Sequence, residues 1–329
     1  MTRPATETTA RPDLVGAGLV VLAAACFGTL GPLSRFAGEA GVDALTIVSW
    51  RAAIGAVVVA VFIGARFVVG GVRPVALRRL PPRDRWFMLA AAAANTLLNL
   101  AAFIAFERIE IALTLLVFYL YPAGVAVVSS TWFGERLDPL RWAALAVSLA
   151  GMGLVMAGAG DVGQLDPVGI GLAFVAGLMQ VFYVLAARHG FARVPGPQAA
   201  TMTMGGAFVF YLVIAAPIGA LPALSQPLDS AAAMWPVVTA GVVGAGVPTL
   251  AFILGIRRLG ASPAAILATL EPVVGVALAA WLLSELPTAL QLVGGALILG
   301  AAILLQLGPR TPIAEHEATP DLDEREASP

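Results

Sequence analysis

Ten long apolar runs constrain the fold of this chain more than any other feature of its sequence. Each run is apolar on all sides, without the polar residue at every second position that a membrane β-strand shows. A helix needs about 20 apolar residues to cross ~30 Å of hydrocarbon. We therefore predict an all-α membrane protein with ten transmembrane helices at residues 14–36, 44–65, 86–106, 111–133, 139–158, 167–187, 198–221, 233–256, 263–283 and 288–307.

The second half of the chain repeats the first at an offset of about 150 residues. The matched pairs are Pro122 and Pro272, Glu135 and Glu285, Arg108 and Arg258, Leu120 and Leu270, and Leu140 and Leu290. Near the first span of each half, Asp13, Gly16, Gly18 and Arg35 match Asp166, Gly169, Gly171 and Arg188. Five helices per repeat is an odd number, so the second repeat, 159–308, enters the membrane inverted relative to the first, 14–158. Inverted repeats are a recurrent plan of secondary transporters, with the substrate site between the halves.

The distribution of arginines predicts the orientation. Cytoplasmic loops are enriched in positive charge, and most arginines fall on one side: Arg66, Arg73, Arg78, Arg79, Arg83, Arg85, Arg136, Arg141, Arg188, Arg193, Arg257 and Arg258. Only Arg35 and Arg108 fall at the other ends of the spans. We expect an inner (plasma) membrane protein with a cytoplasmic tail at 1–13 and a disordered, acidic cytoplasmic tail at 309–329. The apolar run after residue 13 exceeds the 7–15 residues typical of a signal peptide, so we expect it to be retained.

Several function classes are disfavoured by residue usage. All 19 basic residues are arginine, which removes the lysine that a Walker A loop or a pyridoxal Schiff base requires. One cysteine and two histidines show no zinc spacing, and no basic patch with interleaved aromatics indicates nucleic acid. No HExxH, GxSxG or span with two acids occurs. We therefore expect no cofactor, no metal and no enzymatic activity.

Two charged residues within spans are the main site candidates. Glu271 precedes Pro272 inside an apolar helix, where a charge costs about 2.5–3.5 kcal/mol on insertion scales. It either couples a proton or binds a substrate amine, or it is a protonated glutamate bonded to a carbonyl freed by Pro272. Counted from the rise per residue of a helix, Arg51 should lie roughly 10 Å from Glu271 along the membrane normal. It either binds a substrate carboxylate, or extends to the interface or clamps backbone carbonyls.

Polar residues in other spans are further candidates for lining a cavity. They are Asn95 and Asn99, which share a helix face, with Tyr119, Gln180, Tyr183, Thr249 and Thr269. Hydrogen bonding between helices is the alternative role for each of them. Pro32, Pro122, Pro248 and Pro272 lie beside small residues and are candidate hinges. Glu135 and Glu285 end their spans, and we assign them to fixing the following turn.

Together these features resemble the EamA-type carriers of the drug/metabolite transporter superfamily. The resemblance lies in the segment 24–28 (AACFG) with Thr29, in Arg51 and in the paired Pro…Glu stretches, and it covers residues 14–308. It implies a ten-helix inverted-repeat carrier, often an exporter of amino acids or related small metabolites. Family members more often have tryptophan where this chain has Phe27, which leaves the substrate class open.

Our hypothesis is a secondary active transporter that alternates access to a central site, driven by protons through Glu271. Its partners would be a small-molecule substrate, protons and the lipid bilayer, and a monomer would suffice. One alternative is another solute class: cationic drugs, vitamins, nucleotide sugars or sugar phosphates. Phosphates would favour several arginines in the cavity, and Arg51 is the only arginine well inside a predicted span. A passive channel and an intramembrane enzyme are the remaining alternatives.

Overall fold

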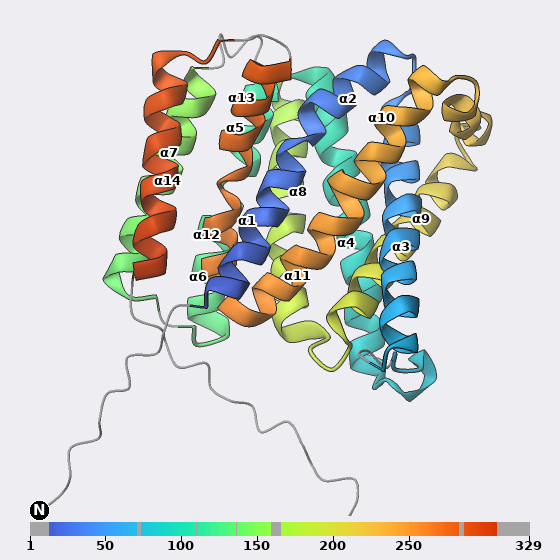
Figure 1. The fold of residues 1–329 in the computed structure, drawn as a ribbon, viewed down its shortest axis with the longest axis horizontal. Helices are drawn as coiled ribbons and strands as arrows, with labels where there is room; N and C mark the ends of the chain where they lie inside the picture. Colours follow the sequence, from blue (N-terminus) through green and yellow to red (C-terminus); the bar gives the residue numbers. More distant parts are fainter. Residues whose placement is uncertain are drawn as a thin grey trace, which may run out of the picture.

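The protein is described here by a computed structural model that covers residues 13–70, 74–109, 111–135, 137–158, 166–282 and 286–307. The tails predicted at 1–13, apart from Asp13, and at 309–329 lie outside the described residues, as do Glu285 and Arg136. Where it is described, the chain forms a bundle of helices with no strand (Figure 1).

The helices follow one another along the chain with short connections. They are α1 (Leu14–Gly28), α2 (Leu30–Glu39), α3 (Ala44–Val68), η1 (Leu77–Arg79), α4 (Pro82–Arg108), α5 (Ile111–Phe118), α6 (Tyr121–Trp132), α7 (Pro139–Ala157), α8 (Pro167–Leu185), η2 (Ala186–Gly190), α9 (Gly196–Ala215), η3 (Leu221–Leu228), α10 (Ala231–Gly241), η4 (Val242–Gly246), α11 (Val247–Leu259), α12 (Ala261–Ala268), α13 (Glu271–Leu282) and α14 (Ala289–Leu307).

Nine helical segments among the described residues are long and apolar enough to cross a membrane. They correspond to the first nine predicted spans. The tenth corresponds to α14, whose apolar stretch Ala289–Leu304 is shorter, so the count of ten spans stays a prediction. The predicted span 198–221 was too long at its end: α9 stops at Ala215, and the chain turns at Gly219 with a positive φ of 72° before forming η3. Glycine has no Cβ and tolerates this backbone conformation.

Local capping explains where several spans begin. The side chains of Asp13, Asp43, Asp138 and Asp166 each accept a hydrogen bond from a backbone N–H in the first turn of the helix that follows. Such caps satisfy N–H groups that have no partner within the helix. Proline occupies the first turn of α4, α7, α8 and α9, where the missing N–H costs nothing.

An ion pair that occurs twice shows how the halves are related. Helix α1 begins and α14 ends at the bottom of Figure 1, which we call the terminal face, whereas α8 begins at the opposite, far face. At the terminal face Arg258 Nε lies 3.1 Å from Asp13 Oδ2. At the far face Arg108 pairs with Asp166, and this hydrogen bond holds the pKa of the Asp166 carboxyl below its ordinary value. In the sequence repeat Asp13 matches Asp166 and Arg258 matches Arg108, yet the two ion pairs lie at opposite faces. The second half is therefore an inverted copy of the first.

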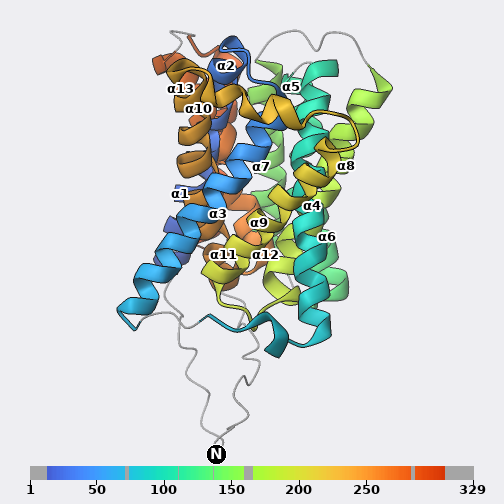
Figure 2. The same ribbon diagram turned by 90° about the vertical axis from the view of Figure 1, so that its right-hand side faces the viewer.

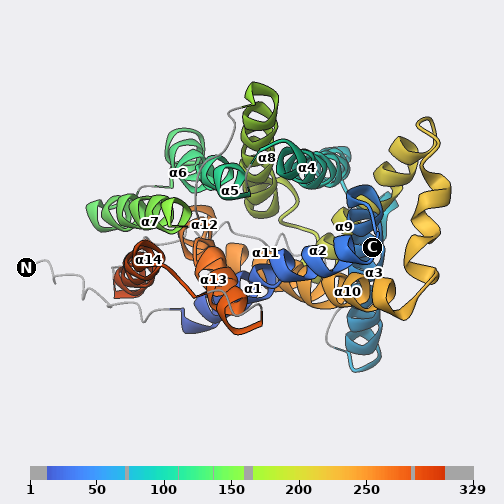
Figure 3. The same ribbon diagram turned by 90° about the horizontal axis from the view of Figure 1, so that it is seen from above.

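Helices of the two halves pack against each other in symmetry-related pairs. Helix α1 contacts α11 as α8 contacts α4, while α3 packs on α9, α6 on α12 and α7 on α14. Seen from above, α7 and α14 lie side by side at one end of the bundle, and α3, α9 and α10 lie at the other (Figure 3). Small residues allow the close approaches: a Cβ on Gly151 would lie 2.6 Å from the carbonyl oxygen of Gly294. The buried core therefore lies largely between the repeats.

Candidate functional site

Two spans are interrupted at equivalent positions in the middle of the bundle. Helix α5 ends at Phe118 and α6 starts at Tyr121, and α12 ends at Ala268 before α13 starts at Glu271. The offset of 150 places Tyr121 opposite Glu271 in the two repeats. Interrupted helices at corresponding places of inverted repeats frequently surround the substrate site, because they leave backbone groups free to bind it. The sequence candidate Glu271 thus lies at a helix break.

The four predicted hinge prolines all follow helix interruptions. Pro122, Pro248 and Pro272 are each the second residue of a helix that resumes after a break, and Pro32 is the third residue of α2. Pro248 follows η4, a π-helical turn. Proline lacks the N–H that would continue the preceding turn, which accounts for these positions. Bending at them during a transport cycle stays a prediction.

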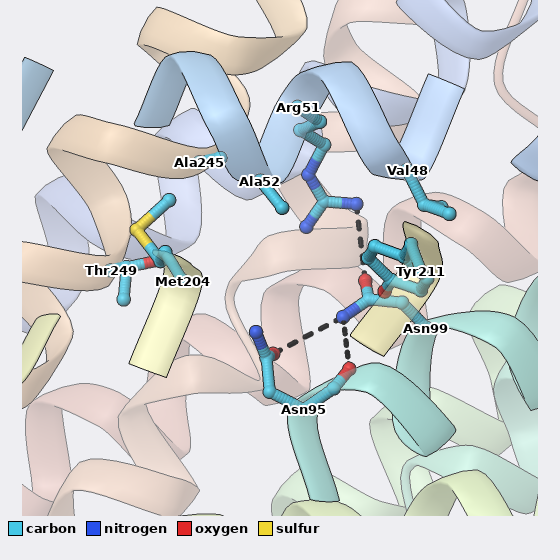
Figure 4. A pocket seen from close by; sticks show the side chains of 9 residues that line it. All are labelled: Val48, Arg51, Ala52, Asn95, Asn99, Met204, Tyr211, Ala245 and Thr249. Carbon is cyan, nitrogen blue, oxygen red and sulfur yellow. Dashed lines mark hydrogen bonds between the residues drawn. The ribbon is translucent and has the colours of Figure 1, made fainter. Parts of the chain in front are cut away.

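A cavity lies between the repeats, where α3 and α4 face α9, η4 and α11 (Figure 4). Its volume is about 20 Å³, which is room for roughly one water molecule. The residues that line it are Val48, Arg51, Ala52, Asn95, Asn99, Met204, Tyr211, Ala245 and Thr249. Four of the nine predicted site residues, Arg51, Asn95, Asn99 and Thr249, are therefore brought together here.

Arg51 is held in the cavity wall by a chain of side-chain amides. Its Nη1 donates to Asn99 Oδ1 at 3.1 Å. Asn99 Nδ2 donates in turn to the backbone oxygen of Asn95 at 2.7 Å and to Asn95 Oδ1 at 3.1 Å. These bonds orient the Asn99 amide with its oxygen toward Arg51 (Figure 4). One guanidinium nitrogen is thus occupied, and the other donors remain available for an acceptor in the cavity.

Glu271 interacts with Arg51 without forming a direct ion pair. The two charges interact electrostatically, but within the described chain no oxygen of Glu271 lies within 4.0 Å of Arg51. Instead the Tyr119 side chain lies beside the Glu271 carboxyl. Glu271 is only partly buried, although it lies at mid-bundle. Arg51 and Glu271 are therefore within electrostatic range of each other without contact, and Glu271 is not among the residues that line the cavity.

An aromatic cluster flanks Glu271 at the break between α5 and α6. The ring centroids of Phe118 and Tyr119 are 5.2 Å apart, those of Phe118 and Tyr121 5.3 Å, and those of Tyr119 and Tyr121 6.1 Å. Tyr121 lies beside Gln180 of α8. Tyr119 and Gln180, both predicted site residues, are thus linked to the surroundings of Glu271 rather than to the cavity lining around Arg51.

Two predicted site residues have local partners away from the cavity lining. Thr269 is buried and its hydroxyl donates to the carbonyl oxygen of Ile266 at 2.6 Å, so it caps the end of α12. Tyr183 is buried, with its hydroxyl 3.5 Å from Thr203 Oγ1 on α9. This arrangement matches the alternative role of bonding between helices.

Sequence reasoning missed Tyr211 and Met204, which also line the cavity. Tyr211 is 1% exposed and its hydroxyl faces the same space in Figure 4. A tyrosine inside an apolar span is a signal in itself, because a buried hydroxyl needs a polar neighbour. Met204 carries no such signal. No group of three or more metal-ligating side chains lies together in the part of the chain that the structure covers.

Comparison with known proteins places these features in a family. A search of curated proteins finds no match. A solved structure described only as "Crystal structure of protein" superposes with a TM-score of 0.72 over 88% of this chain and 95% of its own, at 22% sequence identity, which indicates a shared fold. The sequence model of the EamA-like transporter family matches residues 14–157 and 167–307, one match for each repeat. The chain belongs to the EamA-like transporter family, as the resemblance in its sequence indicated.

Proposed function

We propose that this membrane transporter is a secondary active carrier of amino acids or related small metabolites. The observation that carries the proposal is the arrangement of Arg51, held by Asn99 in the wall of an inter-repeat cavity, with Glu271 at a helix break within range of its charge. A guanidinium binds a carboxylate through paired hydrogen bonds. A zwitterion would place its carboxylate at Arg51 and its amine toward Glu271.

Transport would proceed by alternating access, with protons as the driving ion. Glu271 can exchange a proton as its side of the cavity opens, and the prolines after each helix break supply the bending points. The direction is export, and the terminal face, with both chain ends, is cytoplasmic in an inner membrane. The abundance of arginine at that face supports this orientation. Phosphorylated solutes fit less well, because Arg51 is the single arginine among the cavity-lining residues.

The coupling role of Glu271 is testable in proteoliposomes with an imposed proton gradient. Glu271→Gln keeps the shape of the side chain and removes its titration. We expect it to abolish uphill accumulation of a labelled amino acid, while exchange of labelled for unlabelled substrate continues without a gradient. Glu39→Gln is the matched control, because Glu39 is exposed at the far face and pairs with Arg35 at 3.5 Å. Unchanged uphill accumulation in Glu271→Gln would contradict proton coupling through this residue.

The same assay separates the substrate site from the coupling site. Arg51→Lys keeps the charge but loses the planar fork and the bond geometry to Asn99. A hydrogen bond to a charged group contributes about 1.5–3 kcal/mol, so we expect KM to rise by roughly tenfold or more with coupling intact. An unchanged KM for every amino acid transported would exclude Arg51 as the carboxylate ligand.

A further inference from the structure

The arginines of this chain divide into two groups by their partners. Of the 13 described arginines, seven bond to protein groups: Arg35, Arg51, Arg108, Arg141, Arg188, Arg257 and Arg258. The other six described ones are exposed and have no hydrogen bond or ion pair to protein: Arg66, Arg78, Arg79, Arg83, Arg85 and Arg193. All six lie in the connections or helix ends at the terminal face. The described arginines without a protein partner are thus concentrated at one end of the bundle.

Two of these arginines lie on a connection that is firmly attached to the bundle. Gln198, 8% exposed, donates to the Val75 carbonyl at 2.6 Å and accepts from the Val75 N–H at 2.8 Å. Leu80, 4% exposed, packs in the core. Arg78 and Arg79 lie between these two attachment points, on η1. Figure 2 shows this segment running under the bundle at the terminal face. The guanidinium groups therefore project from a fixed support.

Arg83 lies over an aromatic ring that also contacts the segment just before Arg193. The guanidinium carbon of Arg83 lies 5.6 Å from the centroid of Phe87. The same ring packs against Gly190, where an added Cβ would lie 2.7 Å from it, and Gly190 precedes Arg193 by three residues. We call Arg78, Arg79, Arg83, Arg85 and Arg193 the basic patch.

The local acidic residue does not neutralise the basic patch. Asp84 is the one acid between residues 74 and 89, and it is 6% exposed. Its Oδ2 has no hydrogen-bond partner in the structure, and it forms no ion pair with the neighbouring arginines. The exposed side of the segment therefore presents only positive charge.

Large apolar side chains are exposed beside the basic patch. Trp86 is 69% exposed and Leu77 50%. Tryptophan is enriched where a bilayer meets water, because its ring is apolar with one polar group. A surface that places arginines next to an exposed Trp and Leu at the end of a transmembrane helix fits the head-group region of a bilayer.

We propose that the basic patch binds the phosphate groups of anionic phospholipids in the leaflet at the terminal face. Guanidinium groups bind phosphate oxygens through paired hydrogen bonds, and basic clusters just outside transmembrane helices attract anionic lipid. The proposal requires membrane insertion and is independent of any transport activity. If the arginines served only to orient the chain during insertion, the folded protein would not respond to lipid charge.

Titration of the purified full-length protein in neutral detergent tests the proposal. A short-chain phosphatidylglycerol should raise Tm, and phosphatidylcholine of the same chain length should not. Arg78→Gln combined with Arg79→Gln should shift the titration midpoint to higher lipid concentration by roughly fivefold for each arginine removed. The double substitution to Lys should retain most of the response. Arg35→Gln, a substitution of an exposed arginine at the far face, should leave it unchanged.

Four results would overturn the proposal. One is an equal Tm rise with phosphatidylcholine, and another is an unchanged midpoint in the double Gln variant. The third is an equal response to inorganic phosphate, which would make the patch a general anion site. Removal of residues 308–329, which carry six acidic side chains, should leave the titration unaltered. If instead their removal creates the lipid response, the acidic tail of this chain is the occupant and the lipid assignment is wrong.

Discussion

Arg51 and Glu135 show two ways in which this chain keeps charged residues inside or beside the bundle. Arg51 is stabilised by a neutral amide and a distant carboxylate, which leaves donors free for a ligand. Glu135 is enclosed by fixed partners: its Oε1 lies 3.8 Å from Arg188 Nε and 3.6 Å from His189 Nε2, and Ser262 Oγ lies 3.5 Å from Oε2. The first arrangement suits binding and the second suits stability.

Glu135 should make stability depend on pH at the terminal face. Burial alone would raise its pKa, but the interactions with His189, Arg188 and the backbone N–H of Ala261 outweigh burial and hold the pKa below its ordinary value of 4.5. A lowered pKa contributes stability that is present above 4.5 and is lost as pH falls through the folded-state value. We expect Tm to fall on acidification below that point.

The matched variants are Glu135→Gln and Glu39→Gln, compared by thermal unfolding across this pH range. Glu135→Gln should lower the free energy of unfolding at neutral pH by about 1 kcal/mol, because a charged hydrogen-bond acceptor is lost. Because glutamine does not titrate, this variant should also show a smaller fall in Tm on acidification. Glu39 is 64% exposed in its side chain, so its variant should behave as the parent does. If Tm depends on pH in the same way in both variants, Glu135 does not cause the pH dependence of stability.

At the scale of elements, glycine positions decide which helices can pack together. Helices α7 and α14 cross where Gly151 meets Gly294, and a Cβ on either glycine would lie under 3 Å from the carbonyl oxygen of the other. Two residues along α7, Gly153 has nothing within 4 Å of its added Cβ. In a bilayer the helices gain little from excluding water, so close packing of this kind supplies much of their association.

Alanine at these two glycines should change stability in opposite directions. Gly151→Ala should destabilise the protein by about 1–3 kcal/mol, because the added methyl group forces the helices apart. Gly153→Ala should be neutral or stabilising by up to about 1 kcal/mol, since alanine favours the helix. Thermal unfolding in one detergent measures both. A Gly151→Ala variant as stable as Gly153→Ala would show that the crossing is looser than the structure indicates.

At the scale of the whole molecule, inversion places equivalent residues on opposite faces. Arg108 and Arg258 occupy the same position in the two repeats, and each pairs with the aspartate that caps a first helix. Their side chains are 44% and 49% exposed. The repeat thus forms the same ion pair at the far face and at the terminal face.

Side-selective labelling tests this inversion. In a Cys26→Ser background, the variants Arg108→Cys and Arg258→Cys each carry one cysteine. A membrane-impermeant maleimide added to sealed, right-side-out vesicles should modify only Arg108→Cys, if the terminal face is cytoplasmic. Inside-out vesicles should reverse the result, and the background protein should stay unlabelled. Labelling of both variants from the same side would rule out the inverted arrangement.

The sequence alone was sufficient for the helical class, the positions of nine spans and the family. These conclusions depend on the length of apolar runs and on an offset along the chain, and both are local or linear properties. Offsets of 153 and 150 residues match Asp13 with Asp166 and Arg108 with Arg258, the residues that form the two ion pairs. Part of the cavity was also predictable, since Arg51, Asn95, Asn99 and Thr249 are polar residues in apolar segments.

Only the tertiary structure decided which side of each span faces the cavity. A transmembrane helix is apolar around its whole circumference, so its sequence carries no strong preference for one face. The Tyr183 side chain points to Thr203, whereas the Tyr211 side chain lines the cavity beside Arg51. The packing of the neighbouring helices determines this difference. The breaks before Tyr121 and Glu271 likewise depend on packing, because a proline weakens a helix without determining where its partner groups lie.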